Sequence, residues 1–442
     1  MLLHLLCLAS ASLTLARQSE FSQEIKTLTG SERLITTDSA VPTVSLPEDE
    51  SSIFVSGTAS IPDLSTTSNA TASITSTSTK ESLTQIVGGT RTTGASGNMT
   101  TSSTTTSATP TNTQPCNNYP EFCSRRYSNI TEVCAHNSPF VRKNNAASNQ
   151  AIGVTQQLND GIRMLQGQTH MVNGTLHYCH TSCDLLDAGT VEDYLREVTD
   201  WLDHHPFDVI TILFGNGDYA QTDANGKPLV TAVDFVAPIE KSGLKRYIYQ
   251  PPKTHMKLDD WPTLSELIFL NKRVVTLIDY NFDHEAVPWL LWEFYNMWET
   301  PFSPTGNSFP CDLGRPEGLS REDQEELLYM ANHNLNVEIS IADMHLLVPN
   351  YVQLNQTNGV NGTGSLGEMV QTCTARYARP PNFLLVDFYN EGPFNGSVFA
   401  VAAEANNVTY DRKCCGTASD AAQVSATHLS LVIAIAVCLV LF

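Results

Sequence analysis

The sequence predicts an α/β fold of parallel strands, and a closed TIM (β/α)8 barrel is favoured over an open sheet. Strand-like and helix-like segments alternate through residues 116–412, as in parallel sheets whose strands are connected by helices. The segment 209–214 (VITILF) is almost wholly apolar, which is expected of a strand covered on both faces. An open doubly wound sheet is the alternative, but no Gly-x-Gly-x-x-Gly turn follows the first predicted strand.

Periodicity and turn residues place the individual elements. The predicted strands lie at 129–136, 162–171, 208–216, 247–250, 273–280, 328–332 and 382–389, with an eighth near 298–302. The predicted helices lie at 149–159, 194–205, 267–270, 367–377 and 397–405, with one more after Ser320. Thr190 and Thr263 are each followed three residues later by an acid, a spacing typical of a capping box at a helix start. We interpret the Trp-rich run 289–298 as a core helix.

Both ends of the chain carry targeting patterns. Residues 1–16 resemble a secretory signal peptide, with an apolar stretch before a small-residue cleavage site. Residues 413–442 combine small residues, a polar spacer and an apolar tail, which is the pattern of a GPI-anchor signal. The tail is shorter than the ~20 residues that span a bilayer. The sequence therefore predicts a secreted protein at the cell surface or cell wall, GPI-anchored to the plasma membrane.

Residues 17–115 are dominated by Ser and Thr and contain few apolar residues. Such a segment buries too little apolar surface to offset its conformational entropy. We therefore expect a disordered, glycosylated stalk. Asn-x-Ser/Thr sequons, the acceptor sites of N-glycosylation, start at Asn69, Asn98, Asn129, Asn173, Asn355, Asn361, Asn395 and Asn407.

The formal net charge is −21, and no basic cluster interrupts this acidity. A strongly acidic chain does not bind nucleic acid through its phosphates, and it lacks the polybasic segment that attaches proteins to anionic lipid. Partners of these two kinds are not expected. The protein is expected to be a monomer.

The chain has 11 cysteines, of which Cys7 falls in the signal peptide and Cys438 in the apolar tail. The nine that remain are an odd number, so at least one is unpaired in an oxidising compartment. Cys179 and Cys183 flank His180, and a local bridge between them would stiffen the loop that carries the histidine. A zinc site formed by these three residues is not expected, because no second metal-spaced pair accompanies them.

Two histidines end strand-like segments, His136 after 129–135 and His180 after 176–179. Because the C-terminal ends of barrel strands converge on one face, we expect the two imidazoles to face each other across a pocket. Unperturbed imidazole titrates near a pKa of ~6.5, so a histidine pair can take up one proton and donate another near neutral pH. The alternative for each is a histidine satisfied in the core.

These segments resemble the phosphatidylinositol-specific phospholipase C X-domain family, in particular its secreted fungal branch of PLC-like phosphodiesterases. The resemblance covers roughly 116–410 and is carried by Ala-His-Asn-Ser at 135–138, Gly-Ile-Arg at 161–163, His180, and Leu-Leu-Val-Asp-Phe at 384–388. It implies a distorted TIM barrel and a phosphodiesterase. By resemblance, His136 is the general base, His180 the general acid, and Asp387 orients His136.

The sequence departs from other branches of this family at Gln166 and Gln168. Metal-dependent members have two acids there, and bacterial members have an Asp and an Arg. A neutral amide neither binds Ca²⁺ as a carboxylate does nor neutralises phosphate as a guanidinium does. We therefore expect no cofactor and no calcium, and we include both glutamines among the substrate-binding candidates.

The remaining substrate-binding candidates are polar residues at predicted strand ends, the usual location of barrel active sites. They are Asn137, Asn216, Asp218, Asp279, Tyr280 and Asn332. His170 is set aside, because Asn173-Gly174 has the pattern of a hairpin turn that would lead it away from the site.

The sequence thus predicts an extracellular phosphodiesterase that cleaves an inositol phospholipid or glycosyl-inositol lipid without calcium. The alternative is a catalytically weak or inactive surface glycoprotein that uses its barrel as a binding module. The stalk, the predicted anchor and the two glutamines favour the second interpretation. A metal-dependent phosphodiesterase on the same barrel would require an acidic cluster that the second strand does not supply.

Overall fold

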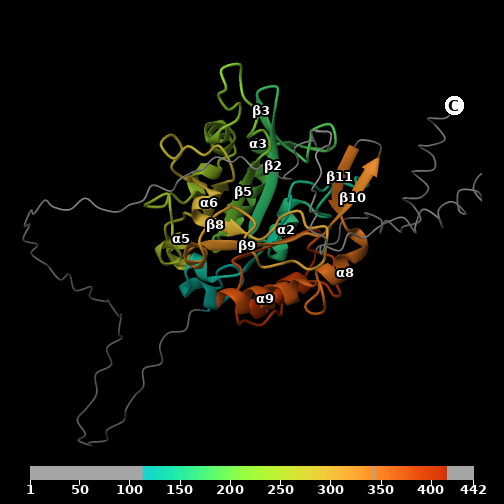
Figure 1. The fold of residues 1–442 in the computed structure, drawn as a ribbon. Coiled ribbons are helices and arrows are strands. Elements are labelled where there is room, and N and C mark those ends of the chain that lie inside the picture. Colours follow the sequence, from blue (N-terminus) through green and yellow to red (C-terminus); the bar gives the residue numbers. More distant parts are fainter. Residues whose placement is uncertain (1–112, 342–343, 416–442) are drawn as a thin grey trace, which may run out of the picture. The chain divides into compact units, whose positions relative to one another are not determined.

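The computed structural model of the chain describes residues 113–341 and 344–415 (Figure 1). The predicted signal peptide, nearly all of the stalk, and the predicted anchor from residue 416 onward lie outside these residues. Within the two described ranges, no helix combines the length and the apolar character needed to span a membrane.

Eight parallel strands form a curled sheet. They are β1 (Glu132–Ala135), β2 (Met164–Val172), β5 (Ile210–Asn216), β6 (Val274–Ile278), β7 (Leu290–Trp292), β8 (Met297–Glu299), β9 (Leu328–His333) and β12 (Phe383–Val386). Their order is β7-β6-β5-β2-β1-β12-β9-β8. The two edge strands are joined in sequence by the short helix α6 (Glu293–Asn296), and in the described residues no strand pairing closes the ring between them. The predicted distorted barrel is confirmed.

One predicted strand and one predicted helix are wrong. Residues 247–250 form no barrel strand: a 3-10 turn, η4 (Leu244–Tyr247), ends there, and Ile248 makes only an isolated bridge to Val274. The Trp-rich run is not one core helix but the sequence β7, α6, β8. Continuous apolar runs do not distinguish a buried strand from a buried helix by periodicity alone, and Leu290, Leu291 and Trp298 are all buried.

The strand β3 (Thr175–Cys179) is not a barrel strand. It pairs antiparallel with the outer half of β2 and with β4 (Asp187–Thr190), as Figure 1 shows. The turn between β2 and β3 has Asn173 at φ 49° and Gly174 at φ 81°, as in the two-residue hairpin predicted there. His180 therefore reaches the strand ends by doubling back along β2. A second hairpin consists of β10 (Asn336–Ile341) and β11 (Met344–Pro349).

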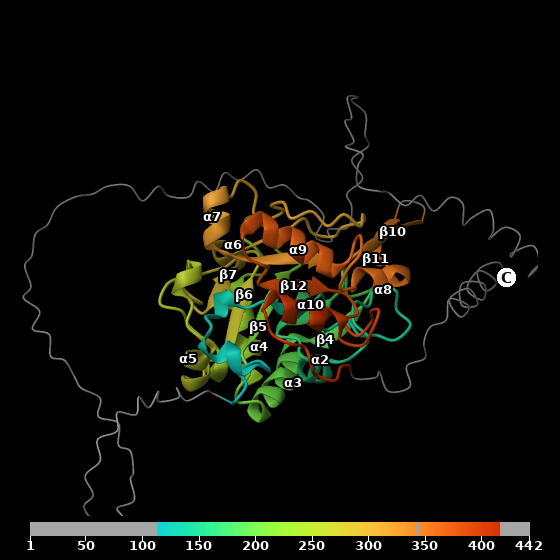
Figure 2. The ribbon, with the colours of Figure 1, turned by 90° about the horizontal axis from the view of Figure 1, so that it is seen from below.

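Helices surround the sheet (Figure 2). They are α2 (Val154–Asp160), α3 (Val191–His204), α4 (Val236–Lys241), α5 (Leu264–Phe269), α7 (Arg321–Glu326), α8 (Leu354–Thr357), α9 (Leu366–Tyr377) and α10 (Ser397–Ala405). The predicted helix starts are confirmed where side chains cap them. The hydroxyls of Thr190, Thr263 and Ser320 each accept a hydrogen bond from the backbone N–H three residues later.

Alternate strand residues face two different cores. Val133 and Ala135 of β1 pack in the cluster that contains the helices, whereas Cys134, Met164 and Leu385 belong to a second cluster inside the barrel. Successive side chains of a strand point to opposite faces. The residues two positions beyond this inner set are His136, Gln166 and Asp387, so the sequence period directs them into the mouth of the barrel.

The cysteines follow the redox prediction. Disulfides join Cys116–Cys123, Cys179–Cys183, Cys311–Cys373 and Cys414–Cys415. Cys134 is free and buried inside the barrel, where burial raises the pKa of its thiol. The prediction of at least one unpaired cysteine and of a local bridge around His180 is confirmed.

Candidate active site

His136 and Asp387 form a buried pair at the carboxyl ends of β1 and β12. The register pairs Ala135 with Val386, so the next residue of each strand lies at the same level. His136 Nδ1 is 2.8 Å from Asp387 Oδ1. A carboxylate in this position accepts the Nδ1 proton and leaves Nε2 as the basic nitrogen of the ring.

Two asparagines complete the surroundings of this imidazole. Asn149 Nδ2 donates to Asp387 Oδ1 at 2.9 Å, which fixes the carboxylate. Asn137 Nδ2 lies 3.2 Å from His136 Nε2, where it donates to the basic nitrogen. A substrate hydroxyl that gives its proton to Nε2 must therefore replace the Asn137 amide.

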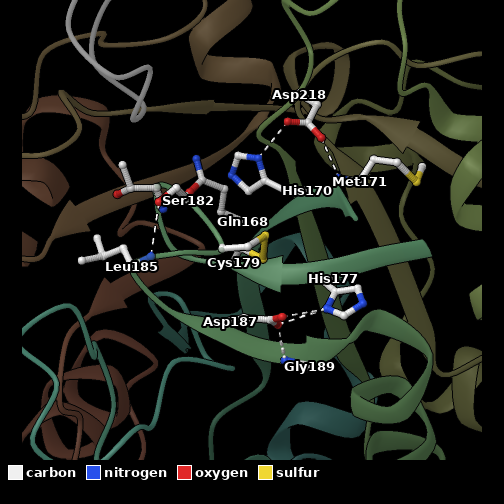
Figure 3. Close-up of a disulfide and its surroundings, with 12 residues drawn as sticks. Gln168, His170, Met171, His177, Cys179, Ser182, Leu185, Asp187, Gly189 and Asp218 are labelled. Atoms are coloured by element: carbon white, nitrogen blue, oxygen red, sulfur yellow. Dashed lines mark hydrogen bonds and ion pairs between the residues drawn. A yellow bond between two sulfur atoms is a disulfide. The ribbon is translucent and has the colours of Figure 1, made fainter. Parts of the chain in front are cut away.

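His180 lies on the short loop after β3. Its backbone N–H donates to Leu186 O at 3.0 Å, and its ring meets the Phe140 ring edge-on with centroids 5.1 Å apart. Phe140 is in the loop that follows His136, so the two histidine-bearing loops are in contact. The Cys179–Cys183 disulfide brackets His180 in the sequence, and Figure 3 shows this disulfide at Cys179. With both sulfurs bonded to each other, the zinc site weighed from the sequence has no thiolate ligands.

Gln166 and Gln168 connect both loops to one strand. Gln166 Oε1 accepts the backbone N–H of Asn137 at 2.8 Å, and Gln168 Oε1 accepts that of Thr181 at 2.7 Å. Figure 3 shows the side chain of Gln168 reaching from β2 to the segment around Ser182. Both glutamines are therefore part of the site, and each contacts the residue that follows one histidine.

A small polar pocket opens beside His136. It is lined by His136, Gln166, Leu213, Gly215, Asp279, Glu293, Glu299, Phe302, Ser303, Arg315, Met330, Asn332, Asn334 and Leu385. The predicted residues Asp279 and Asn332 are therefore beside the histidine, as the strand-end argument requires. His180 is not among the lining residues.

An acid pair that the sequence analysis missed forms the floor of this pocket. Arg315 Nη2 is 2.7 Å from Glu299 Oε2, and Glu293 lies beside them, fully buried. Burial, together with the neighbouring Glu299, raises the pKa of Glu293. Burial also opposes ionisation of Glu299, but the charge of Arg315 and hydrogen bonds from Glu293, Arg315 and Asn332 together lower the pKa of Glu299. Of the two acids, the environment thus favours the protonated form of Glu293 and the ionised form of Glu299.

Asn216, Asp218 and Tyr280 also lie outside the lining of this pocket, and each has other contacts. Asn216 uses its side chain within the turn that follows β5, donating to Val230 O. Tyr280 stacks on Tyr219 with ring centroids 4.2 Å apart. Asp218 is bonded to the hairpin, where Oδ1 meets His170 Nδ1 at 2.8 Å and Oδ2 accepts Met171 N–H at 2.6 Å.

The residues missed by sequence reasoning are Asn149, Glu293, Glu299 and Arg315. Glu293 lies within the Trp-rich run 289–298 and Glu299 directly follows it. Acids in such an apolar segment indicate a polar site, because acids are almost never fully buried without a partner. Nothing comparable marks Arg315, which lies in irregular chain between β8 and α7. In the described part of the chain, one acid–cysteine group has ligand-like spacing, Asp160 with Cys414 and Cys415, and its two sulfurs are bonded to one another.

Residues 122–401 match the family model described as PI-PLC X 1. The fold and site thus define a phospholipase C-like barrel, and the chain belongs to the PI-PLC X family. At the level of that family it is a phospholipase C-like phosphodiesterase, as the residues around His136 and Asp387 indicated.

Two curated relatives come from Arthroderma benhamiae. An "Uncharacterized secreted protein" is 53% identical over 356 residues, covering 79% of this chain and 78% of the relative. A "PI-PLC X domain-containing protein 1" is 44% identical over 279 residues, covering 63% of this chain and 86% of the relative. Among solved structures, a mutant phosphatidylinositol-specific phospholipase C of Staphylococcus aureus aligns with a TM-score of 0.44 at 12% identity, covering 63% of this chain and 94% of that one.

Proposed function

We propose that this protein cleaves the phosphodiester of an inositol phospholipid or glycosyl-inositol lipid outside the cell, by acid–base catalysis without a metal ion. The observation that carries the proposal is the buried His136–Asp387 pair, 2.8 Å apart at the edge of a polar pocket. Family membership supports the reaction class, and one curated relative is described as a secreted protein.

In the proposed reaction, a hydroxyl next to the phosphodiester is the nucleophile. His136 Nε2 removes its proton while the oxygen forms a new bond to phosphorus. The bond from phosphorus to the lipid alcohol breaks, and protonated His180 gives its proton to that leaving oxygen. The products are a cyclic phosphate and a neutral alcohol. Each proton transfer contributes about 10²–10⁴-fold to the rate.

The polar side chains that line the pocket beside His136 suit the hydroxyl groups of a polyol. The carboxylates of Glu299 and Asp279 can accept hydrogen bonds from ring hydroxyls, and Arg315 and Asn332 can donate to them. With Glu293 protonated, the two remaining acid charges exceed the single arginine charge. An uncharged polyol therefore fits this pocket better than a ring that carries additional phosphate groups.

The absence of a metal requirement follows from what the two glutamines already do. Their Oε1 atoms accept backbone N–H groups at 2.8 and 2.7 Å, and neither side chain carries the negative charge that Ca²⁺ sites use. Under this proposal the developing phosphoryl charge is stabilised by protonated His180 and by neutral donors. We also propose that the chain is secreted and held at the surface by a GPI anchor, as its terminal sequences predict.

The test is turnover of phosphatidylinositol vesicles by the full secreted chain, with and without EDTA, for the wild type, His136→Ala and His180→Ala. The proposal requires wild-type turnover that EDTA does not change and that falls at least ~100-fold in each variant. Loss of turnover in EDTA would remove the metal-free mechanism.

The alternative function is a surface glycoprotein that binds its ligand without cleaving it. The neutral glutamines favour this alternative, because charge stabilisation is usually the largest catalytic contribution. Equal rates for the wild type and both histidine variants, together with retained binding to the vesicles, would establish it.

A further inference from the structure

Two equivalent hydrogen bonds connect side chains of β2 to the loops that carry His136 and His180. Gln166 and Gln168 are alternate residues of β2, so their side chains leave the same face of the strand. Gly167 between them faces the other way, where a Cβ would lie 2.8 Å from the Tyr178 ring. Each glutamine accepts one backbone N–H, from Asn137 or from Thr181. Each of these two residues directly follows a histidine of the proposed mechanism.

The two residues share an unusual backbone conformation. Asn137 has φ 47° and Thr181 has φ 60°, in the left-handed region that residues with a Cβ seldom adopt. Such a conformation costs on the order of 1–3 kcal/mol and persists only where the surroundings hold it. The two glutamines thus hydrogen-bond to the backbone at its strained residues. The conformation of each strained residue sets the direction in which the side chain of the preceding histidine points.

We propose that Gln166 and Gln168 are positioning residues, each fixing one histidine through the backbone of the residue that follows it. Gln166 acts on His136 and Gln168 acts on His180. The inference rests on the proposed function, because it says that one strand, β2, determines how far apart the proposed base and acid are held. Residues i and i+2 of a strand are roughly 7 Å apart, so β2 sets the distance between the points at which the two loops are attached.

The same geometry explains why a neutral amide stands at these positions. Because Oε1 must accept the backbone N–H, the orientation of the amide is fixed and Nε2 points elsewhere. Neither Nε2 makes a hydrogen bond within the described residues, and Gln166 lines the pocket. A carboxylate would accept the same N–H but would add negative charge beside a phosphodiester. Glutamine keeps the acceptor without adding that charge.

Two kinds of substitution separate these roles. Gln→Met keeps the length of the side chain but removes the acceptor. Gln→Glu keeps the acceptor and adds a charge. Gln324→Met is the matched control, because Gln324 is also buried and its Oε1 also accepts a hydrogen bond, from Tyr377 Oη, but it lies on α7 outside the site.

The experiment compares two phosphodiesters of inositol, phosphatidylinositol with its alkyl leaving group and a p-nitrophenyl ester whose leaving group needs no proton. For Gln168→Met, we expect kcat on phosphatidylinositol to fall about 10–100-fold, as for a misplacement of ~1 Å, with near-normal kcat on the nitrophenyl ester, as for His180→Ala. For Gln166→Met, we expect kcat to fall on both substrates, as for His136→Ala. The KM values should change less than ~3-fold.

The Gln168→Glu variant provides a second test. We expect it to slow both substrates by the same factor, so that the ratio of the two kcat values stays at the wild-type value. Hydrogen exchange adds a readout that does not depend on turnover: the amides of Asn137 and Thr181 should exchange at least ~10-fold faster in the respective Met variant, but not in Gln168→Glu or Gln324→Met.

The inference is overturned if Gln168→Met slows both substrates equally, if either Met variant has wild-type kinetics, or if amide exchange is unchanged. Wild-type rates in His136→Ala and His180→Ala would instead overturn the proposed function, and with it the catalytic meaning of these bonds, whatever the exchange data show.

Discussion

Asp387 Oδ1 lies 2.8 Å from Nδ1 of His136, although the two residues are 251 positions apart in the sequence. The parallel pairing of β1 with β12 brings them together, because Ala135 and Val386 are register partners. A buried carboxylate behind an imidazole orients the ring and selects the tautomer with the proton on Nδ1.

Replacing Asp387 by Asn should reduce kcat on phosphatidylinositol by about 10⁴-fold, because an amide that donates to Nδ1 places the ring proton on Nε2, the wrong nitrogen for a base. Steady-state kinetics of the full chain measure this loss. Asp160→Asn is the control, since Asp160 is a buried acid that accepts from Tyr389 Oη at 2.6 Å. The control should lose stability but keep its kcat. A folded Asp387→Asn protein with more than a tenth of the wild-type kcat would contradict the assigned role.

The sequence could predict this pair because each residue ends an apolar strand, and strand ends in a parallel barrel meet on one face. His180 does not end a barrel strand as predicted, because 175–179 is the return strand of a hairpin. Its loop reaches the same face because β3 pairs with the outer half of β2.

Glu299 and Arg315 show why the rest of the pocket could not be predicted. Both contribute to one ion pair, but they come from a strand inside an aromatic run and from irregular chain after it. Their meeting depends on how the chain turns between β8 and β9, which no local periodicity encodes. Asn149, likewise, acts on Asp387 from a distance of 238 residues.

Breaking the Cys179–Cys183 bridge should reduce activity more than stability. The bridge closes a loop of five residues, for which the chain-entropy estimate is about 2 kcal/mol, but this loop carries His180. In Cys179→Ser/Cys183→Ser, we expect kcat on phosphatidylinositol to fall at least ~10-fold and the p-nitrophenyl ester to be turned over nearly normally.

The control for this bridge is Cys311→Ser/Cys373→Ser. Those cysteines are 62 positions apart, so the same estimate gives about 4 kcal/mol, and the bridge lies between α9 and the chain before α7. This variant should be the less stable of the two in urea yet keep its kcat per folded molecule. The opposite ranking of the two activities would show that the Cys179–Cys183 bridge does not position His180.

Glu293 should make the protein less stable as the pH rises. Its pKa is raised in the folded state by burial, so its stabilising contribution is complete below the unfolded pKa of ~4.3 and is lost as the pH rises towards the folded pKa. Glu299 acts in the opposite direction, because its folded pKa is lowered and its contribution is lost only in acid. The Glu293→Gln variant removes the first dependence.

Urea unfolding of the wild type and Glu293→Gln at pH 5 and pH 8 measures this difference. The variant should gain stability relative to the wild type as the pH rises, by up to about 1.4 kcal/mol for each pH unit. Glu404→Gln is the control, because Glu404 is an exposed residue of α10 outside the pocket. Parallel pH curves for Glu293→Gln and the wild type would show that Glu293 is ionised in the folded protein.

Removing Arg315 should be costly mainly because of the charge it leaves behind. Glu299 is 1% exposed and Arg315 supplies its cationic partner at 2.7 Å. Loss of one member of a buried pair typically costs about 3–5 kcal/mol, so Arg315→Met should lower the free energy of unfolding by that amount near neutral pH. The double variant Arg315→Met/Glu299→Gln should recover at least ~2 kcal/mol of this loss, because no buried charge then lacks a partner.

Urea unfolding of the wild type, the two single variants and the double variant forms a double-mutant cycle. Additive losses in that cycle would show that the ion pair does not hold Glu299 in its charged form, and the pocket would then lack the carboxylate that the proposed head-group site requires.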